Sequence, residues 1–308
     1  MLMSPIFDST INHAIDQLID QQQLPLAYRD LVDGYLVELS HCLSTKQCAK
    51  SAPLIVGVNG GQGSGKSTLC QFLKLLLEKH CNKRCVILSI DDFYLSRADR
   101  KQLAGEHHPL LQTRGVPGTH DIGLAIDTIT KLQQYKPVSL PGFDKSDDDV
   151  IASVHWQEIS GQVDIILLEG WCVGAVPQIE EALHQPINDL EKNEDVDGLW
   201  RHYVNKKLGN EYQRLFEKID FLVMLKVPSM SSVYEWRNLQ EKKLAVTADG
   251  NQIMTEEQIQ RFVDHYERLT CHILQEMPSR ADVVFELTKS HGIERSTWLE
   301  SMSISDGK

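Results

Sequence analysis

Four glycines fall within six consecutive positions of this sequence, between an apolar run and a leucine-rich segment. The loop is Gly60-Gly61-Gln62-Gly63-Ser64-Gly65-Lys66-Ser67, with apolar residues at 54–58 before it and leucines at 69–77 after it. So much glycine would weaken a regular helix or strand, because glycine loses the most backbone freedom on folding. Bare backbone between a strand and a helix instead suits an anion, since successive N–H groups can point inward without a Cβ clash. The feature therefore predicts a strand–loop–helix unit built around a phosphate group.

The loop matches the pattern G-x-x-x-x-G-K-[ST] at Gly60, Gly65, Lys66 and Ser67. In such a loop the lysine reaches the β- and γ-phosphates of a nucleotide, and the hydroxyl ligates Mg²⁺. The N-terminus of the following helix adds unpaired N–H groups and partial positive charge. A flexible glycine-serine turn is the alternative, and the flanking strand and helix disfavour it. The expected ATP-binding residues are Gly60, Gly61, Gln62, Gly63, Ser64, Gly65, Lys66, Ser67 and Thr68.

Apolar runs and helix-like stretches alternate along the chain. The runs cover residues 54–58, 85–90, 163–168, 220–225 and 282–287. Strands that are apolar throughout and alternate with helices indicate a parallel sheet covered on both faces. We therefore expect an α/β fold, a three-layer sandwich with a mainly parallel five-stranded sheet. Ligands bind at the carboxyl ends of such strands, so the residues after each run are the first site candidates.

Helix signals also mark both ends of the chain. Two amphipathic helices are predicted within residues 8–43, separated by Pro25. Near the other end, Thr255 and Gln258 form a capping-box pattern before an amphipathic stretch. The N-terminal helices are expected to pack on the main domain as an extension.

Two segments break the alternation. Residues 93–150 hold little strand signal and are rich in proline, glycine, histidine and aspartate. Such a varied segment is expected to be functional, because long loops in compact domains often are. Residues 175–212 are mostly polar, and we expect them to form a solvated insertion.

Carboxylates follow two of the apolar runs. The second run leads into Asp91 and Asp92, and the third ends at Glu169. Adjacent carboxylates at a strand end point to opposite sides, so one of the pair can face the phosphate loop and accept a proton from a substrate hydroxyl. A solvated Asp-Asp turn is the alternative. Glu169 is placed as the acid of a Walker-B strand, which touches Mg²⁺ directly or through water.

Positive charge is concentrated in the varied segment and after the fourth run. Arg114 offers a planar fork for a carboxylate or phosphate, and Lys145 offers a point charge after a Pro-Gly turn. Incidental charges on a surface loop are the alternative. Arg237 can cover the phosphates as a lid arginine, or it can pair with Glu241 at i,i+4 on a helix surface.

A zinc site is a further alternative for the histidines of this segment. It would use His107, His108 and His120. Adjacent histidines rarely converge on one ion, and no cysteine joins them, so we disfavour this site.

Composition bounds the class of protein. The 31 basic and 43 acidic residues give a formal net charge of -12, which disfavours a general nucleic-acid or membrane-surface binder. No apolar stretch approaches the ~20 residues that span a bilayer, and the first residues lack the basic region of a secretory signal. The seven cysteines lack metal-site spacing. We expect reduced thiols in the cytoplasm, and neither a nucleic-acid nor a membrane partner.

Taken in order over roughly residues 50–290, these motifs resemble the plant-type D-glycerate 3-kinase family. The matching segments are residues 60–67, 89–94, 114–121, 141–146, 169–174 and 236–241. The wider relatives of that family are uridine kinase, bacterial pantothenate kinase and phosphoribulokinase. The resemblance implies a P-loop NTPase fold, ATP and Mg²⁺ as cofactors, and phosphorylation of a small hydroxyl substrate.

The resemblance also implies roles for the residues. It makes Asp91 the catalytic base, with Lys66 and Arg237 as the other catalytic candidates. The expected substrate-binding residues are Asp91, Tyr94, Arg114, His120 and Lys145. The expected metal ligands are Ser67, Asp91 and Glu169. D-glycerate, converted to 3-phosphoglycerate, is the leading acceptor, while pantothenate-, uridine- and sugar-like acceptors stay open, as does a monomer or a small homo-oligomer.

The order of these motifs and helix patterns also predicts the domain boundaries. We expect a helical extension at 1–50, a P-loop kinase domain at 51–300 and a flexible tail at 301–308. Within the kinase domain, we expect a substrate-binding insertion at 93–150 and a lid region at 229–250.

A nucleotide-dependent switch or regulatory ATPase is the alternative from a different class. A GTPase would need an N-K-x-D sequence after a late strand, and Asn205-Lys206-Lys207-Leu208 lacks the aspartate and follows no strand. The acid at Asp91 and the cationic residues have no role in a switch. A small-molecule kinase is therefore the favoured interpretation.

Overall fold

A mostly parallel six-stranded sheet forms the centre of the computed structural model, which describes residues 7–247 and 254–299. The strand order is β10-β9-β8-β1-β7-β2, and within this sheet the β9–β10 pair is antiparallel whereas the other pairs are parallel. The strands are β1 (Leu54–Gly60), β2 (Cys85–Ser89), β7 (Ile165–Gly170), β8 (Phe221–Lys226), β9 (Val283–Leu287) and β10 (Ile293–Trp298). The five predicted strands are confirmed. The sheet has one strand more than predicted, because edge strand β10 is largely polar and carries no apolar run.

The sheet is covered on both faces, which confirms the predicted three-layer sandwich. Alternate residues of β1 enter opposite cores: Val56 packs with the cluster that contains α4 (Lys66–Lys79), and Ile55 packs with the cluster of α6 (Ile122–Gln133) and α11 (Glu256–Glu276). This two-sided burial explains why the strand is apolar throughout. The predicted capping box of Thr255 and Gln258 begins α11.

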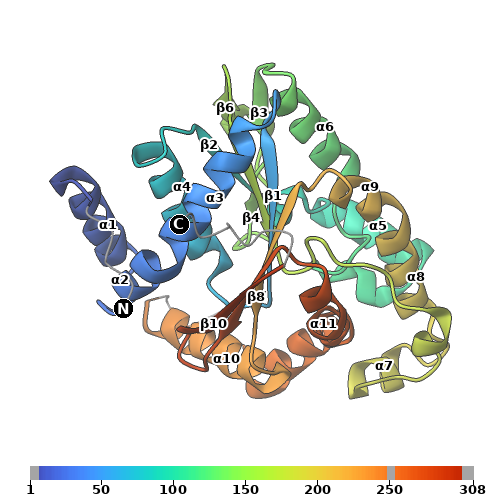
Figure 1. Cartoon of the computed structure of the whole chain (residues 1–308). Helices are drawn as coiled ribbons and strands as arrows, with labels where there is room; N and C mark the ends of the chain where they lie inside the picture. Colours follow the sequence, from blue (N-terminus) through green and yellow to red (C-terminus); the bar gives the residue numbers. More distant parts are fainter. Residues whose placement is uncertain (1–6, 248–253, 300–308) are drawn as a thin grey trace.

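The N-terminal helices pack against α4 on one face of the sheet (Figure 1). They are α1 (Ser9–Gln21), α2 (Tyr28–Leu31) and α3 (Val37–Cys48), and a π-helical turn at Val32–Leu36 joins the last two. Ile15, Leu36, Leu39 and Leu43 are fully buried in this contact region. The two predicted amphipathic helices are present, and the second contains the π-helical turn.

The segment after β2 contains local structure that the sequence pattern did not predict. It holds α5 (Arg97–Glu106), α6 and the short strands β3 (Val138–Leu140), β4 (Phe143–Asp144) and β5 (Asp149–Val150); β3 pairs with β6 (Gln157–Ile159). The Arg100 guanidinium is 1% exposed and donates to the carbonyls of Leu95, Gln112 and Asp148. One buried arginine therefore ties three stretches of this segment together.

The prediction of a solvated insertion at 175–212 is wrong in its centre. The segment forms α7 (Asp189–Glu194), α8 (Leu199–Lys207) and a π-helical turn at Leu208–Tyr212, with α9 (Gln213–Phe216) after it. Glu191 accepts two 2.6 Å hydrogen bonds from Arg268 of α11, and Asp195 pairs with Arg201 at 2.9 Å. Both carboxylates are buried. Composition misled the prediction because both carboxylates are paired with arginines in the interior. Arg268 lies 77 residues from Glu191 along the chain, and Arg201 lies 6 residues from Asp195.

We expect Glu191→Gln to lower the free energy of unfolding by about 3 kcal/mol, because it leaves the Arg268 charge buried without its counter-charge. Urea unfolding followed by circular dichroism measures the change. Glu194→Gln is the matched control, since it removes an exposed partner of Arg261 from the same helix and should cost less than about 1 kcal/mol. Equal losses in the two variants would contradict the role of burial.

The remaining features concern the surface and the ends of the chain. Across the part that the structure describes, no helix is long and apolar enough to cross a membrane. All seven cysteines are free thiols. The predicted tail at 301–308 and residues 248–250 of the predicted lid lie outside the described residues.

Candidate active site

The phosphate loop joins β1 to α4 with the conformation that its glycines predict. Gly63 has φ +77° and Gly65, the residue before α4, has φ +84°, which other residues rarely adopt. A Cβ on Gly63 would lie 2.8 Å from Trp236 Cβ. His291, stacked on Trp236 with ring centroids 4.2 Å apart, hydrogen-bonds the Gly63 carbonyl at 2.9 Å. Helix α10 (Met230–Thr247) and the β9–β10 turn therefore hold the loop from outside.

Ser67 and Glu169 meet at the start of α4. The Ser67 hydroxyl donates to Glu169 Oε1 at 2.8 Å, because β7 lies beside β1 and ends at the loop. Glu169 is 5% exposed, and its Oε2 atom has no hydrogen-bond partner among the described residues. A buried carboxylate oxygen left open beside a serine hydroxyl fits Mg²⁺, which takes oxygen ligands.

Asp91 follows β2 and receives two hydrogen bonds. The Tyr94 hydroxyl donates to Oδ1 at 2.9 Å, and Lys145 Nζ donates to Oδ2 at 2.7 Å. Burial would raise the pKa of Asp91, but the charges of Lys145 and Lys66 outweigh it and hold the pKa below its usual value. Asp91 is therefore an ionised carboxylate held near the phosphate-loop lysine. The predicted role of Asp91 as a metal ligand, together with Ser67 and Glu169, stays a prediction.

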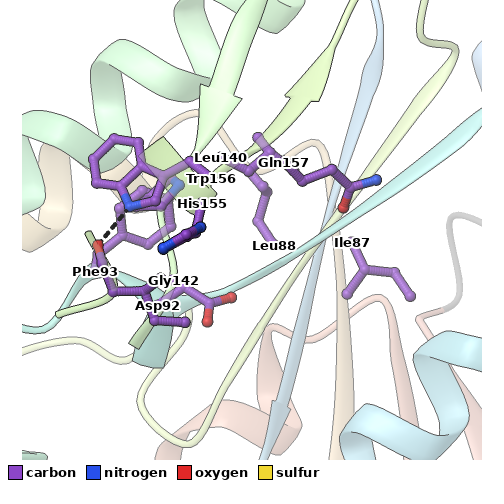
Figure 2. A pocket seen from close by; sticks show the side chains of 11 residues that line it. Ile87, Leu88, Asp92, Phe93, Leu140, Gly142, His155, Trp156 and Gln157 are labelled. Carbon is purple, nitrogen blue, oxygen red and sulfur yellow. Dashed lines mark hydrogen bonds between the residues drawn. The ribbon is translucent and has the colours of Figure 1, made fainter. Parts of the chain in front are cut away.

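Asp92 lines a separate cavity, as expected for adjacent carboxylates that point to opposite sides. The cavity has a volume of about 230 Å³ and is walled by Phe93, His155 and Trp156 among other residues (Figure 2). Burial raises the pKa of Asp92 to about 6, and the negative charges of Asp91 and Glu169 act in the same direction. The pair of acids is thus divided between two environments, and Asp91 is the one in contact with Tyr94 and Lys145.

Arg114 and Lys145 come together in the segment after β2. Arg114 pairs with Asp148, and its Cζ atom lies 5.5 Å from the centre of the Phe143 ring. Its guanidinium also reaches the Lys145 carbonyl at 3.5 Å. Asp148 is in turn paired with the buried Arg100 at 3.1 Å. The two cations expected to hold the substrate are therefore neighbours, with Lys145 in contact with Asp91 and Arg114 paired with Asp148.

His120 is buried beside Tyr94, with the two rings stacked 4.4 Å apart. An isolated β-bridge joins the same two residues. Burial lowers the pKa of His120 to about 4, although the charge of Asp91 opposes the shift. At neutral pH His120 is uncharged, so it can offer the substrate a hydrogen bond but no positive charge.

Arg237 lies on α10, with its Cζ atom 4.9 Å from the centre of the Phe262 ring on α11. The guanidinium also contributes positive charge near Tyr266. The alternative pair with Glu241 lies outside the described side chains. A role as lid arginine stays a proposal.

Sequence reasoning missed several residues that shape this site. Arg100 and Asp148 organise the cationic segment, Tyr266 donates to the Arg114 carbonyl at 3.1 Å, and Tyr212 contacts His120. Tyr212 and Tyr266 come from segments far along the chain. No local pattern marks them, because their role depends on tertiary contacts.

Comparisons with known proteins show that the chain is similar to kinases. No protein-family model matches the chain. An uncharacterized kinase, mug58, of Schizosaccharomyces pombe is 35% identical over 225 residues, which cover 70% of this chain and 78% of that protein. The chloroplastic D-glycerate 3-kinase of Arabidopsis thaliana is 31% identical over 224 residues, which cover 70% of this chain but 46% of that protein. The solved structure of D-glycerate 3-kinase from Cryptococcus neoformans superposes with a TM-score of 0.71 at 26% identity, covering 86% of this chain and 99% of that one.

Proposed function

Because the chain belongs to the family of P-loop kinases that includes D-glycerate 3-kinase, we propose that it transfers a phosphoryl group from ATP to D-glycerate and forms 3-phosphoglycerate. The observation that carries this proposal is the placing of Asp91. It is an ionised carboxylate between Tyr94 and Lys145, near Lys66 of the phosphate loop. A regulatory ATPase, with water as the only acceptor, has no use for this arrangement.

The phosphate loop binds the polyphosphate of ATP. The backbone N–H groups around Gly63 and Gly65 and the N-terminus of α4 face the negative charge, and Lys66 adds its own cation at the β- and γ-phosphates. Trp236 and His291 keep the loop in this conformation. Little rearrangement is then needed when ATP binds.

The acceptor hydroxyl lies against Asp91. In the transfer step the hydroxyl oxygen forms a bond to the γ-phosphorus, the bond from that phosphorus to the β,γ-bridging oxygen breaks, and the hydroxyl proton passes to Asp91. The electron pair of the broken bond stays on ADP. Each carboxylate oxygen keeps lone-pair capacity beside its hydrogen bond from Tyr94 or Lys145, so the acceptor can approach without losing both contacts. Catalysis depends mainly on positioning and charge stabilisation.

Ser67 and Glu169 would hold Mg²⁺, as the open Oε2 atom of Glu169 suggests. The ion would neutralise charge on the phosphates when bound. Arg237 is proposed to cover the transferring phosphoryl group from α10.

Arg114 and Lys145 favour an acceptor that carries a negative charge. Arg114 has a planar fork that suits a carboxylate, and it exchanges Asp148 for the substrate carboxylate in this proposal. A neutral acceptor such as uridine would leave both cations without a role. This is why D-glycerate is preferred to a nucleoside among the open acceptors.

We expect Arg114→Ala to raise the KM for D-glycerate about tenfold or more while leaving the KM for ATP within about twofold, because one charge-assisted contact is lost from the acceptor alone. Steady-state kinetics with each substrate varied in turn measure both values. Arg97→Ala is the matched control, since Arg97 is an exposed arginine of the same segment. An equal rise in both KM values would instead indicate that Arg114 contacts the nucleotide.

The product tests the proposed reaction. D-glycerate has a primary and a secondary hydroxyl, and the proposal requires the phosphate on the primary one. Coupling between phosphorus and the neighbouring protons in NMR spectra distinguishes the two esters. Phosphate on the secondary hydroxyl, or phosphorylation of pantothenate in place of D-glycerate, would overturn the assignment.

A further inference from the structure

Tyr212 forms a buried bridge between the backbone and His120. Its hydroxyl oxygen accepts a hydrogen bond from the Gly118 N–H at 2.9 Å and lies 2.6 Å from His120 Nδ1. Tyr212 is 0% exposed and His120 is 4% exposed. Both contacts are therefore shielded from bulk solvent.

The direction of the hydrogen bond between Tyr212 and His120 Nδ1 follows from the donors present. The Gly118 N–H can only donate, so it uses a lone pair of the Tyr212 oxygen and leaves the hydroxyl proton to be placed. The acceptor that is within reach of that proton, among the described residues, is His120 Nδ1. If Nδ1 carried a proton instead, the buried Tyr212 proton would have no acceptor, which is costly. Tyr212 therefore donates to Nδ1, and the proton of the neutral imidazole sits on Nε2.

The other ring nitrogen of His120, Nε2, is a buried polar atom that lacks a hydrogen-bond partner among the described residues. The ring is stacked on Tyr94, whose hydroxyl donates to Asp91. A buried donor without a partner costs free energy of folding, and only the Tyr94 side chain separates this one from the proposed base Asp91.

We propose that Tyr212 is a positioning residue that locks His120 as an Nε2–H donor, and that this donor hydrogen-bonds an oxygen of the phosphate acceptor. The inference rests on the proposed function for the identity of the acceptor. It adds that His120 selects an acceptor with a carboxylate or hydroxyl oxygen at this point, and that it does so as a neutral donor. Arg114 and Lys145 then supply the charge for binding.

The local fold explains how one tyrosine can reach this place. Tyr212 ends the π-helical turn at Leu208–Tyr212, a rare arrangement that often occurs at functional sites. Gly118 has φ +104°, and a Cβ on it would lie 2.6 Å from a ring carbon of Tyr203. Glycine at 118 thus lets the backbone N–H come close to the packed tyrosines.

The first test needs no substrate. Long-range proton–nitrogen NMR spectra distinguish a protonated ring nitrogen from a bare one, and the loss of a signal in His120→Gln identifies His120 among the 12 histidines. We expect a bare Nδ1 and a protonated Nε2 in the unmodified protein. In Tyr212→Phe, which removes the hydroxyl and keeps the ring, we expect a mixture of the two forms. A protonated Nδ1 in the unmodified protein, or an unchanged spectrum in Tyr212→Phe, would overturn the inference.

The second test is kinetic, with D-glycerate and ATP·Mg²⁺. We expect Tyr212→Phe to raise the KM for D-glycerate about five- to tenfold, a loss typical of one misdirected hydrogen bond, with the KM for ATP unchanged. Tyr203→Phe is the matched control, because Tyr203 packs near the same glycine but makes no ring contact with His120 among the described residues. A purely structural Tyr212 would lower stability without this split between the two KM values, and that result would contradict the inference.

A pair of substitutions at His120 separates the two ring nitrogens. The amide nitrogen of glutamine lies near the position of Nε2, and that of asparagine lies near Nδ1. We expect His120→Gln to keep more affinity for D-glycerate than His120→Asn, and the reverse order would count against an Nε2–H donor. If D-glycerate is not phosphorylated at all, the proposed function fails, while the spectra without substrate still decide the protonation of His120.

Discussion

Replacing Lys66 with alanine is expected to lower kcat/KM for ATP by about 10³-fold or more and to weaken ATP binding. Lys66 begins α4 directly after Gly65, where the loop and the helix N-terminus converge. Its ammonium group is the cation of the loop that reaches the β- and γ-phosphates in motifs of this kind. Removal of one fixed group that stabilises transition-state charge costs about 10²–10³ in rate, and Lys66 also contributes to ground-state binding.

Lys74→Ala is the matched control for this experiment. Lys74 lies on the same helix, is partly exposed and pairs with Glu78 at 3.8 Å. Its loss should change neither ATP affinity nor turnover by more than about twofold, since exposed pairs contribute little. Calorimetric titration with ATP and steady-state kinetics give the two quantities. Normal ATP binding by Lys66→Ala would contradict the assignment of the phosphate loop.

Asp91→Asn is expected to lower kcat by about 10³-fold while ATP still binds. General base catalysis contributes about 10²–10⁴ in rate. The asparagine side chain keeps the shape of Asp91 and can still accept the hydrogen bond from Tyr94, but it cannot take up the proton of the acceptor hydroxyl. Lys145 also loses its counter-charge, so its contact with the acceptor is expected to change.

Asp92→Asn is the control, because Asp92 has the same chemistry at the next position but lines the cavity beside His155 and Trp156 (Figure 2). We expect its kcat to stay within about threefold of the unmodified protein. Parallel measurements of kcat and of ATP affinity decide between the two acids. If Asp91→Asn kept near-normal kcat and Asp92→Asn lost it, Asp92 would be the base.

The central sheet and the phosphate loop were predictable because their signals are local. An apolar run before a glycine-rich loop, and a leucine-rich helix after it, fix β1, the loop and α4 in one stretch of sequence. The carboxyl-end rule then placed Asp91 and Glu169 near the loop, because β2, β7 and β1 are neighbours in the sheet. Edge strand β10 escaped prediction because one polar strand at a sheet edge carries no apolar run.

The acceptor side of the site was predictable only in part. Arg114, His120 and Lys145 stood out as residue types, but their partners did not, since Asp148, Tyr212 and Tyr266 meet them through the tertiary fold. Buried pairs such as Glu191 with Arg268 misled the composition argument for the same reason. A polar segment is therefore not necessarily exposed, because its charged side chains can be buried when each pairs with an opposite charge from another part of the fold.

The central claim is that this chain is a kinase for a small anionic acceptor, and ADP release in a coupled assay tests it most directly. The assay supplies ATP, Mg²⁺ and one acceptor at a time: D-glycerate, L-glycerate, pantothenate, uridine or ribulose 5-phosphate. We predict fast ADP release with D-glycerate, little with the other compounds, and none above background in Lys66→Ala. ATP binding without acceptor-dependent ADP release from any of the five compounds would contradict the proposed acceptor and favour a regulatory ATPase.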